Sequence, residues 1–179
     1  MLKSNLIGSI YKGTEHFYIS KHFIETNNSL TYIARDDREI FQLNDKLKWL
    51  IPNKQIFIFR SWDQIPYDKV SPKKEIQSER IKTLYKLTVN KKNKYILLTS
   101  VNAIIQKVID EKIINDNFIS ININKEYNFK TLIFKLIELG YQRRSVVREK
   151  TEFSIRGSII DIYLAENVNP IRLDFFNNK

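Results

Sequence analysis

Cysteine is missing from the 179 residues of this chain. Without a thiol there is no disulfide scaffold, no thiolate metal site and no cysteine nucleophile, and the absence fits a reducing compartment. No apolar run approaches the roughly 20 residues that a membrane-spanning helix needs. No apolar segment follows the first five residues, as a secretory signal would require. We therefore expect a soluble, cytoplasmic protein that has no membrane partner.

Residues typical of catalytic sites are also scarce. His16 and His22 are six residues apart on one expected helix, a spacing that does not place both on one face for a shared metal ion. No serine lies in a nucleophile elbow. The acidic residues fall mainly at helix starts and on solvated faces. We predict no catalytic residues, no metal site and no cofactor.

Positive charge, in contrast, is abundant. The formal net charge is +10 and the isoelectric point is about 9.6, values that invite a nucleic-acid interpretation. Most lysines are scattered singly, however, which favours a diffusely basic surface over a dedicated groove. One cluster stands out and remains a candidate for nucleic-acid contact: Arg143, Arg144, Arg148 and Lys150.

Short apolar strands alternate with amphipathic helices over the first two thirds of the chain. Strands are predicted at residues 30–34, 56–59 and 95–99. Helices are predicted at 15–25, from a cap at Asp36 or Asp37 to 50, at 75–87 and at 101–108. The apolar stripe expected for the helix at 75–87 consists of Ile76, Ile81, Leu84 and Leu87. This alternation predicts an α/β domain with a parallel sheet, whose binding edge lies at the carboxyl ends of the strands.

The pattern changes near Asn117, where one helix and a run of neighbouring strands predict a separate α+β domain. A strand is expected at 118–123 and a helix at 128–139, ended by Gly140. Further strands are expected at 141–148, 152–156, 158–163 and 171–176. We divide the chain into domains at 1–116 and 117–179. Because only three residues follow the last expected strand, we expect the second domain to be truncated.

Residues 8–15 carry the glycine spacing of a phosphate-binding loop. Gly8 and Gly13 form the G-x-x-x-x-G pattern ahead of a predicted helix. A working loop continues with a lysine for the phosphates and a serine or threonine for magnesium. Thr14 and Glu15 stand at those positions, and a carboxylate there would repel a triphosphate. The segment is either a degenerate loop or a chance match, and both interpretations predict no ATP hydrolysis from it.

Three stretches of the sequence together carry a family pattern. They are FRSWDQIPYD at 59–68 with the following Ser71–Pro72 and 76–84, LLTSVNAIIQK at 97–107, and GY…VRE…EFSIRGSIIDIY…PIRLDFF at 140–176. In this order they resemble the N-terminal blocks of bacterial transcription-repair coupling factors, over nearly the whole chain. Two mild departures are Ser158, where the family has glycine, and Leu164, where it has proline.

The resemblance implies a module similar to the repair protein UvrB. It would comprise a RecA-like domain with a degenerate phosphate loop and a small domain that binds UvrA. The family's UvrA-facing residues fall on Arg156, Arg172 and Phe176. A complete coupling factor would also have motor domains and would contact RNA polymerase and double-stranded DNA. No motor segment is present in this chain, so we expect it to be non-catalytic.

Strand geometry supports these residues independently of the resemblance. Residues two apart share a face, so Arg172 and Phe176 are displayed together if Leu173 and Phe175 are core. An arginine beside an exposed aromatic is typical of a protein–protein hot spot. The alternatives are a surface ion pair of Arg172 with Asp174, and ordinary core packing for Phe176.

Three smaller expectations follow from the same segments. Asp161 interrupts an apolar strand, and we expect one of the arginines, Arg156 or Arg172, to orient it. Gly157 is expected to mark a bulge or a close backbone approach. For the loop containing Trp62, we expect packing over the strand ends more than contact with a neighbouring domain.

The sequence thus predicts a non-catalytic module that recruits UvrA to stalled RNA polymerase in transcription-coupled nucleotide excision repair. Two alternatives stay open. The chain could be part of a UvrB-like ATP-dependent protein that recognises DNA damage, or it could be a basic DNA-binding domain that uses the arginine cluster at 143–148.

Overall fold

The computed structural model describes residues 8, 10–64, 69–123, 125–164 and 167–175. Two compact units are present, one from residues 1–72 with 80–109 and the other from residues 73–79 with 110–179. Each is described by itself below. The division into domains between residues 116 and 117 stays a prediction.

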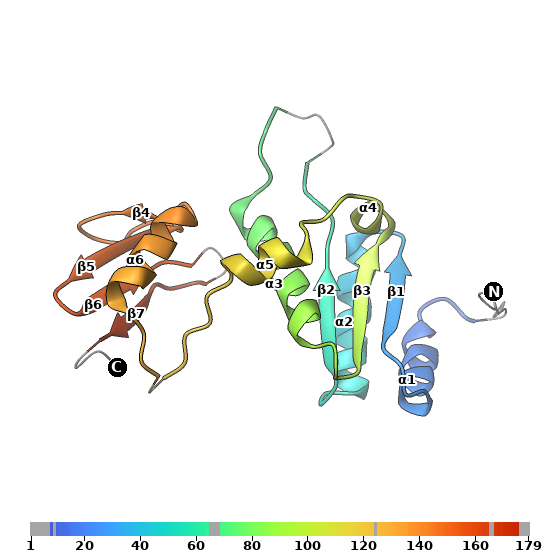
Figure 1. The fold of residues 1–179 in the computed structure, drawn as a ribbon. Helices are drawn as coiled ribbons and strands as arrows, with labels where there is room; N and C mark the ends of the chain where they lie inside the picture. Colours follow the sequence, from blue (N-terminus) through green and yellow to red (C-terminus); the bar gives the residue numbers. More distant parts are fainter. Residues whose placement is uncertain (1–7, 9, 65–68, 124, 165–166, 176–179) are drawn as a thin grey trace. The chain divides into compact units, whose positions relative to one another are not determined.

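The first unit contains a three-stranded parallel sheet in the order β1-β3-β2 (Figure 1). The strands are β1 (Leu30–Ala34), β2 (Gln55–Phe59) and β3 (Tyr95–Ser100). In the register, Leu98 of the central strand lies between Tyr32 and Ile58. The three predicted strands and their parallel arrangement are therefore confirmed.

Two helices pack on one core with this sheet. They are α1 (Glu15–Glu25) and α2 (Asp37–Leu50), and α2 begins at the predicted cap because Asp36 accepts a hydrogen bond from the Glu39 amide. The fully buried side chains of the core come from both helices and from the central strand: Phe23, Ile40, Leu47, Ile96 and Leu98.

The next helix, α3 (Lys74–Val89), differs from its predicted apolar stripe. Ile81 is exposed, whereas Arg80 and Thr83 are buried. Thr83 donates its hydroxyl to the Ile58 carbonyl at 2.7 Å, and Arg80 donates to the Arg60 carbonyl. The buried face of the helix thus lies against two backbone carbonyls, that of Ile58 in β2 and that of Arg60 directly after β2. These carbonyls need hydrogen-bond donors. The predicted stripe was therefore wrong at Ile81, whereas Ile76 is buried as predicted.

Two short helices follow β3. α4 (Val101–Ile104) ends four residues before the predicted helix end at 108, and α5 (Glu111–Asn117) was not predicted. Asp110 caps α5 by accepting a hydrogen bond from the Lys112 amide at 2.8 Å. Among the residues that the structure describes, no helix has the length and apolar character needed to cross a membrane.

The second unit packs α6 (Phe129–Glu138) against a four-stranded sheet in the order β4-β5-β6-β7. Its strands are β4 (Gln142–Arg143), β5 (Glu152–Arg156), β6 (Ile159–Ile162) and β7 (Ile171–Asp174). The β4–β5 pair is parallel, and the other two pairs are antiparallel. The core of this unit is centred on Phe153, Ile160 and Ile162.

Two predicted strands of this unit were wrong in whole or in part. Residues 118–123 form no strand, and the Tyr127 hydroxyl contacts their backbone by accepting from the Asn122 amide and donating to the Ser120 carbonyl. The strand predicted at 141–148 is reduced to β4. Beyond it, the amides of Arg148 and Glu149 donate to the Glu152 carboxylate and not to a neighbouring strand.

Gly157 belongs to a tight hairpin turn. Arg156 of β5 pairs with Ile159 of β6, so Gly157 and Ser158 are the two turn residues. Gly157 has a φ of 60°, and a Cβ placed on it would meet no atom within 4 Å. The expectation of a bulge or a close approach was therefore wrong, because the turn requires the left-handed backbone of a two-residue hairpin loop.

Candidate functional site

The β5–β7 sheet of the second unit has one apolar and one polar face. The register places Ser154, Asp161 and Arg172 in one row across the three strands. Directly opposite residues of antiparallel strands share a face. The neighbouring row on this face contains Arg156, whereas the alternate residues of each strand join the core with α6. The polar face is thus the surface on which the predicted arginines lie.

Arg172 and Asp161 form a two-bond ion pair on this face. The Arg172 Nε donates to one Asp161 carboxylate oxygen at 2.6 Å, and its Nη2 donates to the other at 3.0 Å. The arginine side chain is 62% exposed, but the aspartate side chain is only 15% exposed. The guanidinium lowers the pKa of Asp161 below its ordinary value. Orientation of Asp161 by an arginine is confirmed, and Asp161, not Asp174, holds the Arg172 fork.

Arg156 lies on the same face, but its side chain is not held by another residue that the structure describes. Its side chain is exposed and makes no hydrogen bond or ion pair with another described residue. Its charge contributes, after that of Arg172, to the lowered pKa of Asp161. The third predicted residue, Phe176, lies outside the described residues. The structure therefore brings together two of the three predicted partner-binding residues.

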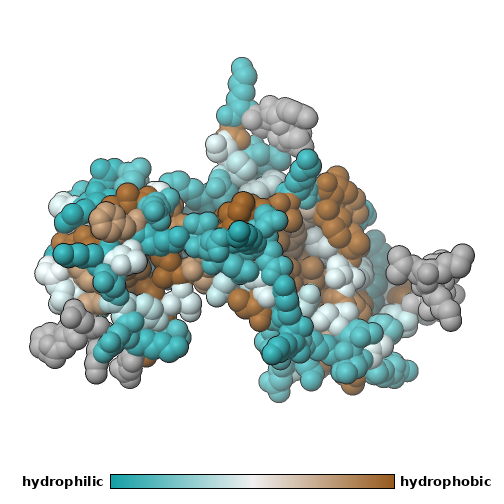
Figure 2. Space-filling view, viewed as in Figure 1, coloured by the Kyte–Doolittle hydropathy of each residue, from teal (hydrophilic) through white to brown (hydrophobic). Residues whose placement is uncertain are grey.

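The arginine cluster after β4 is organised by one carboxylate. Arg144 Nε lies 3.1 Å from a Glu152 oxygen, and its Nη2 donates to the Gln142 side chain at 2.7 Å. The other Glu152 oxygen accepts from the amides of Arg148 and Glu149. These bonds, with the two amides first, lower the pKa of Glu152. Arg144 is thus engaged within the chain, whereas Arg143 and Arg148 are exposed. Figure 2 likewise shows hydrophilic residues spread over the visible surface and not gathered in one patch.

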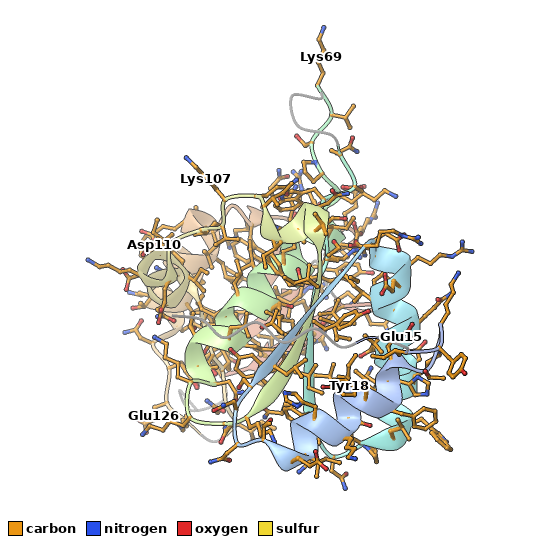
Figure 3. The ribbon with its side chains drawn as sticks, turned by 90° about the vertical axis from the view of Figure 1, so that its right-hand side faces the viewer. Glu15, Tyr18, Lys69, Lys107, Asp110 and Glu126 are labelled. Carbon is orange, nitrogen blue, oxygen red and sulfur yellow. The ribbon has the colours of Figure 1, made fainter. Side chains whose placement is uncertain are left out.

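The glycine loop ahead of α1 is occupied by its own carboxylate. The Gly13 amide donates to the Glu15 carboxylate at 2.9 Å, and the Thr14 amide donates to the Tyr11 carbonyl. Lys46 donates to the Gly13 carbonyl at 3.1 Å. The Gly13 bond is the main cause of the lowered pKa of Glu15, which Figure 3 places at the start of α1. Two backbone donors that could hold phosphate are therefore already used.

A second carboxylate joins the strand ends of the parallel sheet. Asp37, the first residue of α2, accepts from the Ser61 amide with both oxygens at 3.1 Å. One of these oxygens also accepts from the Ser100 hydroxyl at 2.8 Å, and Arg60 Nε lies 3.6 Å away. The sequence predicts Asp37 only as a candidate helix cap. The signal that could have identified the cluster is an aspartate three residues after β1, together with a serine two residues after β2 and a serine at the end of β3.

Arg80 is buried beside this edge. Its guanidinium lies 4.1 Å from the Phe59 ring centroid and 4.2 Å from that of Trp62. Burial lowers the pKa of this group, although Asp37 opposes the effect. For Trp62 the predicted packing over the strand ends is confirmed, whereas residues 65–68 of that loop lie outside the described residues. No cluster of three or more metal-ligating side chains occurs in the described ranges.

Comparison with known proteins identifies the class of the second unit and the relatives of the chain. Residues 119–179 match the UvrB interaction domain family. The chain is 26% identical over 174 residues to the transcription-repair-coupling factor of Haemophilus influenzae, covering 97% of the chain and 15% of the relative. It is 30% identical over 149 residues to the coupling factor of Rickettsia prowazekii, covering 83% of the chain and 13% of that relative. It is 24% identical over 178 residues to the coupling factor of Bacillus subtilis, covering 99% of the chain and 15% of that relative.

The second unit is thus of the UvrB interaction class, a small α+β domain with one polar sheet face. The chain as a whole is homologous to a part of the bacterial transcription-repair-coupling factors, as the resemblance predicted. It spans about 15% of the length of the relatives that it covers most fully.

Proposed function

We propose that the chain is a non-catalytic docking module that recruits UvrA to stalled RNA polymerase in transcription-coupled nucleotide excision repair. The observation that carries the proposal is the polar face of a UvrB interaction domain on which Arg156 and Arg172 are exposed together. Exposed arginines are enriched at the centres of protein interfaces, and Phe176 would add the aromatic residue of such a centre.

The first unit supports a scaffolding role. We propose that it is a RecA-like domain with a degenerate phosphate loop. Glu15 occupies the loop amide at Gly13, and Asp37 occupies the amide and hydroxyl at the strand ends. An incoming phosphate would have to displace these carboxylates against their negative charge. A catalytic role for this unit in ATP hydrolysis is therefore disfavoured.

In the longer relatives the surrounding protein would supply further contacts. We propose RNA polymerase and double-stranded DNA as partners of the complete coupling factor and not of this chain. The exposed Arg143 and Arg148 are the residues for which a nucleic-acid contact stays a prediction. Binding of DNA with a steep dependence on salt, retained when Arg172 is removed, would favour that alternative.

Titration calorimetry of the full chain with purified UvrA tests the proposal. We expect Arg156→Ala and Arg172→Ala each to weaken binding about tenfold or more, the range of hot-spot residues. Arg143→Ala is the matched control, since it removes an exposed arginine of the same unit outside the antiparallel rows. Unchanged affinity in both test variants, with wild-type folding, would refute UvrA docking on this face.

A further inference from the structure

The two arginines of the polar face differ in how they are held. Arg172 is fixed by two hydrogen bonds to a carboxylate that is itself largely buried. The Arg156 side chain, one row away, has no bonded partner among the described residues. One cation is therefore set in a fixed orientation before any partner arrives, and the other is free to adjust.

The chemistry of the guanidinium makes this difference useful. Asp161 bonds the side edge of the group, formed by Nε and Nη2. The end edge, formed by Nη1 and the second N–H of Nη2, is not used by Asp161. A planar guanidinium can bind one carboxylate on each of these edges. Because the Arg172 side chain is 62% exposed, the end edge is the one available to a partner.

We propose that Asp161 is a positioning residue, which holds Arg172 so that the end edge of its guanidinium receives a carboxylate of the docking partner. Arg156 acts beside it as an adjustable point charge. The inference rests on the proposed function, since the partner is the protein proposed to dock on this face. It adds that the partner presents an acidic side chain opposite Arg172.

The energetic reason lies in preorganisation. A free arginine loses side-chain entropy when a partner fixes it, and an arginine held beforehand has already lost that freedom. Arg172 would therefore form its intermolecular pair at a lower entropic cost than Arg156 does. The same logic makes the planar fork essential at Arg172, whereas any cation suffices at Arg156.

Asp161→Asn distinguishes positioning from simple electrostatics by the sign of its effect. The change keeps the side chain's size but removes a negative charge beside two arginines. If Asp161 only neutralised them, its loss would tighten binding to an acidic partner. If Asp161 positions Arg172, binding weakens although the face becomes more positive. We expect about a tenfold loss of affinity for UvrA by calorimetry.

Asp174→Asn is the matched control. Asp174 carries the same charge on the same strand and face as Arg172, but it does not hold the Arg172 fork. This variant should bind UvrA as tightly as the wild type or more tightly. Equal or tighter binding by Asp161→Asn would overturn the positioning role. Absence of binding by the wild-type chain would instead remove the proposed function and this inference together.

Conservative substitutions supply a second test, in case Asp161→Asn perturbs the sheet. Arg172→Lys keeps the charge but loses the fork, so its affinity should fall as far as that of Asp161→Asn. Adding Asp161→Asn to Arg172→Lys should then cause no further loss of affinity. Arg156→Lys should retain most of the affinity. Equal tolerance of lysine at both positions would contradict the proposed division of roles.

A spectroscopic measurement tests the positioning without any partner. In ¹H–¹⁵N spectra of the isolated chain, the Arg172 Nε–H should be protected from exchange with water in the wild type and lose that protection in Asp161→Asn. The Arg156 Nε–H should exchange rapidly in both proteins. An unprotected Arg172 Nε–H in the wild type would show that the fork is not held in solution.

Discussion

Among the described carboxylates that bind backbone amides, three are Glu15, Asp37 and Glu152. Glu15 accepts from the glycine-loop amide, Asp37 from the amide that follows β2, and Glu152 from two amides of the loop after β4. Each carboxylate binds N–H groups of a loop in its own chain. In an open loop these N–H groups would be available to an anion from solution. These amides are therefore bonded within the chain.

Asp37 carries the largest structural role of the three, because loops from two other strands depend on it. We expect Asp37→Ala to lower the free energy of unfolding by about 1–3 kcal/mol, since the partly buried Ser61 amide and Ser100 hydroxyl lose their acceptor. Urea denaturation followed by circular dichroism measures this loss. Glu25→Ala, which removes an exposed carboxylate of the same unit, should change stability by less than about 0.5 kcal/mol.

A loss from Asp37→Ala no larger than that from Glu25→Ala would show that the cluster at the strand ends contributes little. The alternative acceptor for the Ser61 amide would then be water, as for any exposed loop.

Residue roles were predictable where alternation along a strand decides them. The period of two places Arg172 and Asp161 outward and Leu173 inward, and the structure agrees. The burial of Arg80 was not predictable, because it depends on the Arg60 carbonyl and on the rings of Phe59 and Trp62, all distant in sequence. Contacts of this kind become visible only when the strands are in place.

At the scale of the element, the hairpin between β5 and β6 is the one that presents Arg156. Its turn requires a φ of 60° at Gly157, which a residue with a Cβ adopts at a cost of about 1–2 kcal/mol. We expect Gly157→Ala to lower the free energy of unfolding by about that amount in thermal or urea denaturation. Gly157→Asn should cost less, because asparagine tolerates the left-handed region.

Ser158→Ala serves as the control for this turn, since it changes the neighbouring exposed residue without a backbone requirement. Equal stability of Gly157→Ala and Ser158→Ala would mean that the turn adopts another conformation in solution.

The elements of the first unit were predictable because their strands are continuous apolar runs between amphipathic helices, as parallel sheets require. The strand expected at 118–123 failed because isoleucines at alternate positions imitate a half-buried strand. Ile123 is in fact 92% exposed, and Tyr127 contacts the local backbone. α5 was missed because only one of its residues, Ile114, is buried, so it has no apolar stripe.

At the scale of the whole molecule, both units contain carboxylates whose pKa lies below the ordinary value. Among them are Glu15 and Asp36 in the first unit and Glu152 and Asp161 in the second. Hydrogen bonds to amides are the main cause for the first three, and the Arg172 guanidinium is the main cause for Asp161. A depressed pKa means that the folded state binds the proton more weakly than the unfolded chain does.

Stability should therefore depend on pH with a definite sign. Above the ordinary carboxylate pKa of about 4, the contribution of these groups is fully present. As the pH falls through their lower folded-state values, the unfolded chain gains protons first, and the contribution is lost. Acidification also raises the net charge above its neutral-pH value of +10, and the added self-repulsion acts in the same direction.

We accordingly expect the midpoint of thermal unfolding to be nearly constant from about pH 7 to 5 and to fall steeply below about pH 4. Glu152→Gln removes one of the carboxylates whose pKa is lowered. The midpoint of thermal unfolding of this variant should therefore be lower than that of the wild type at neutral pH and should fall less on acidification. Glu126→Gln, an exposed carboxylate of the same unit, should keep the wild-type profile. A midpoint that rises as the pH falls from 5 to 3 would contradict the lowered pKa values, because a group favoured in its charged form by folding cannot gain stability from protonation.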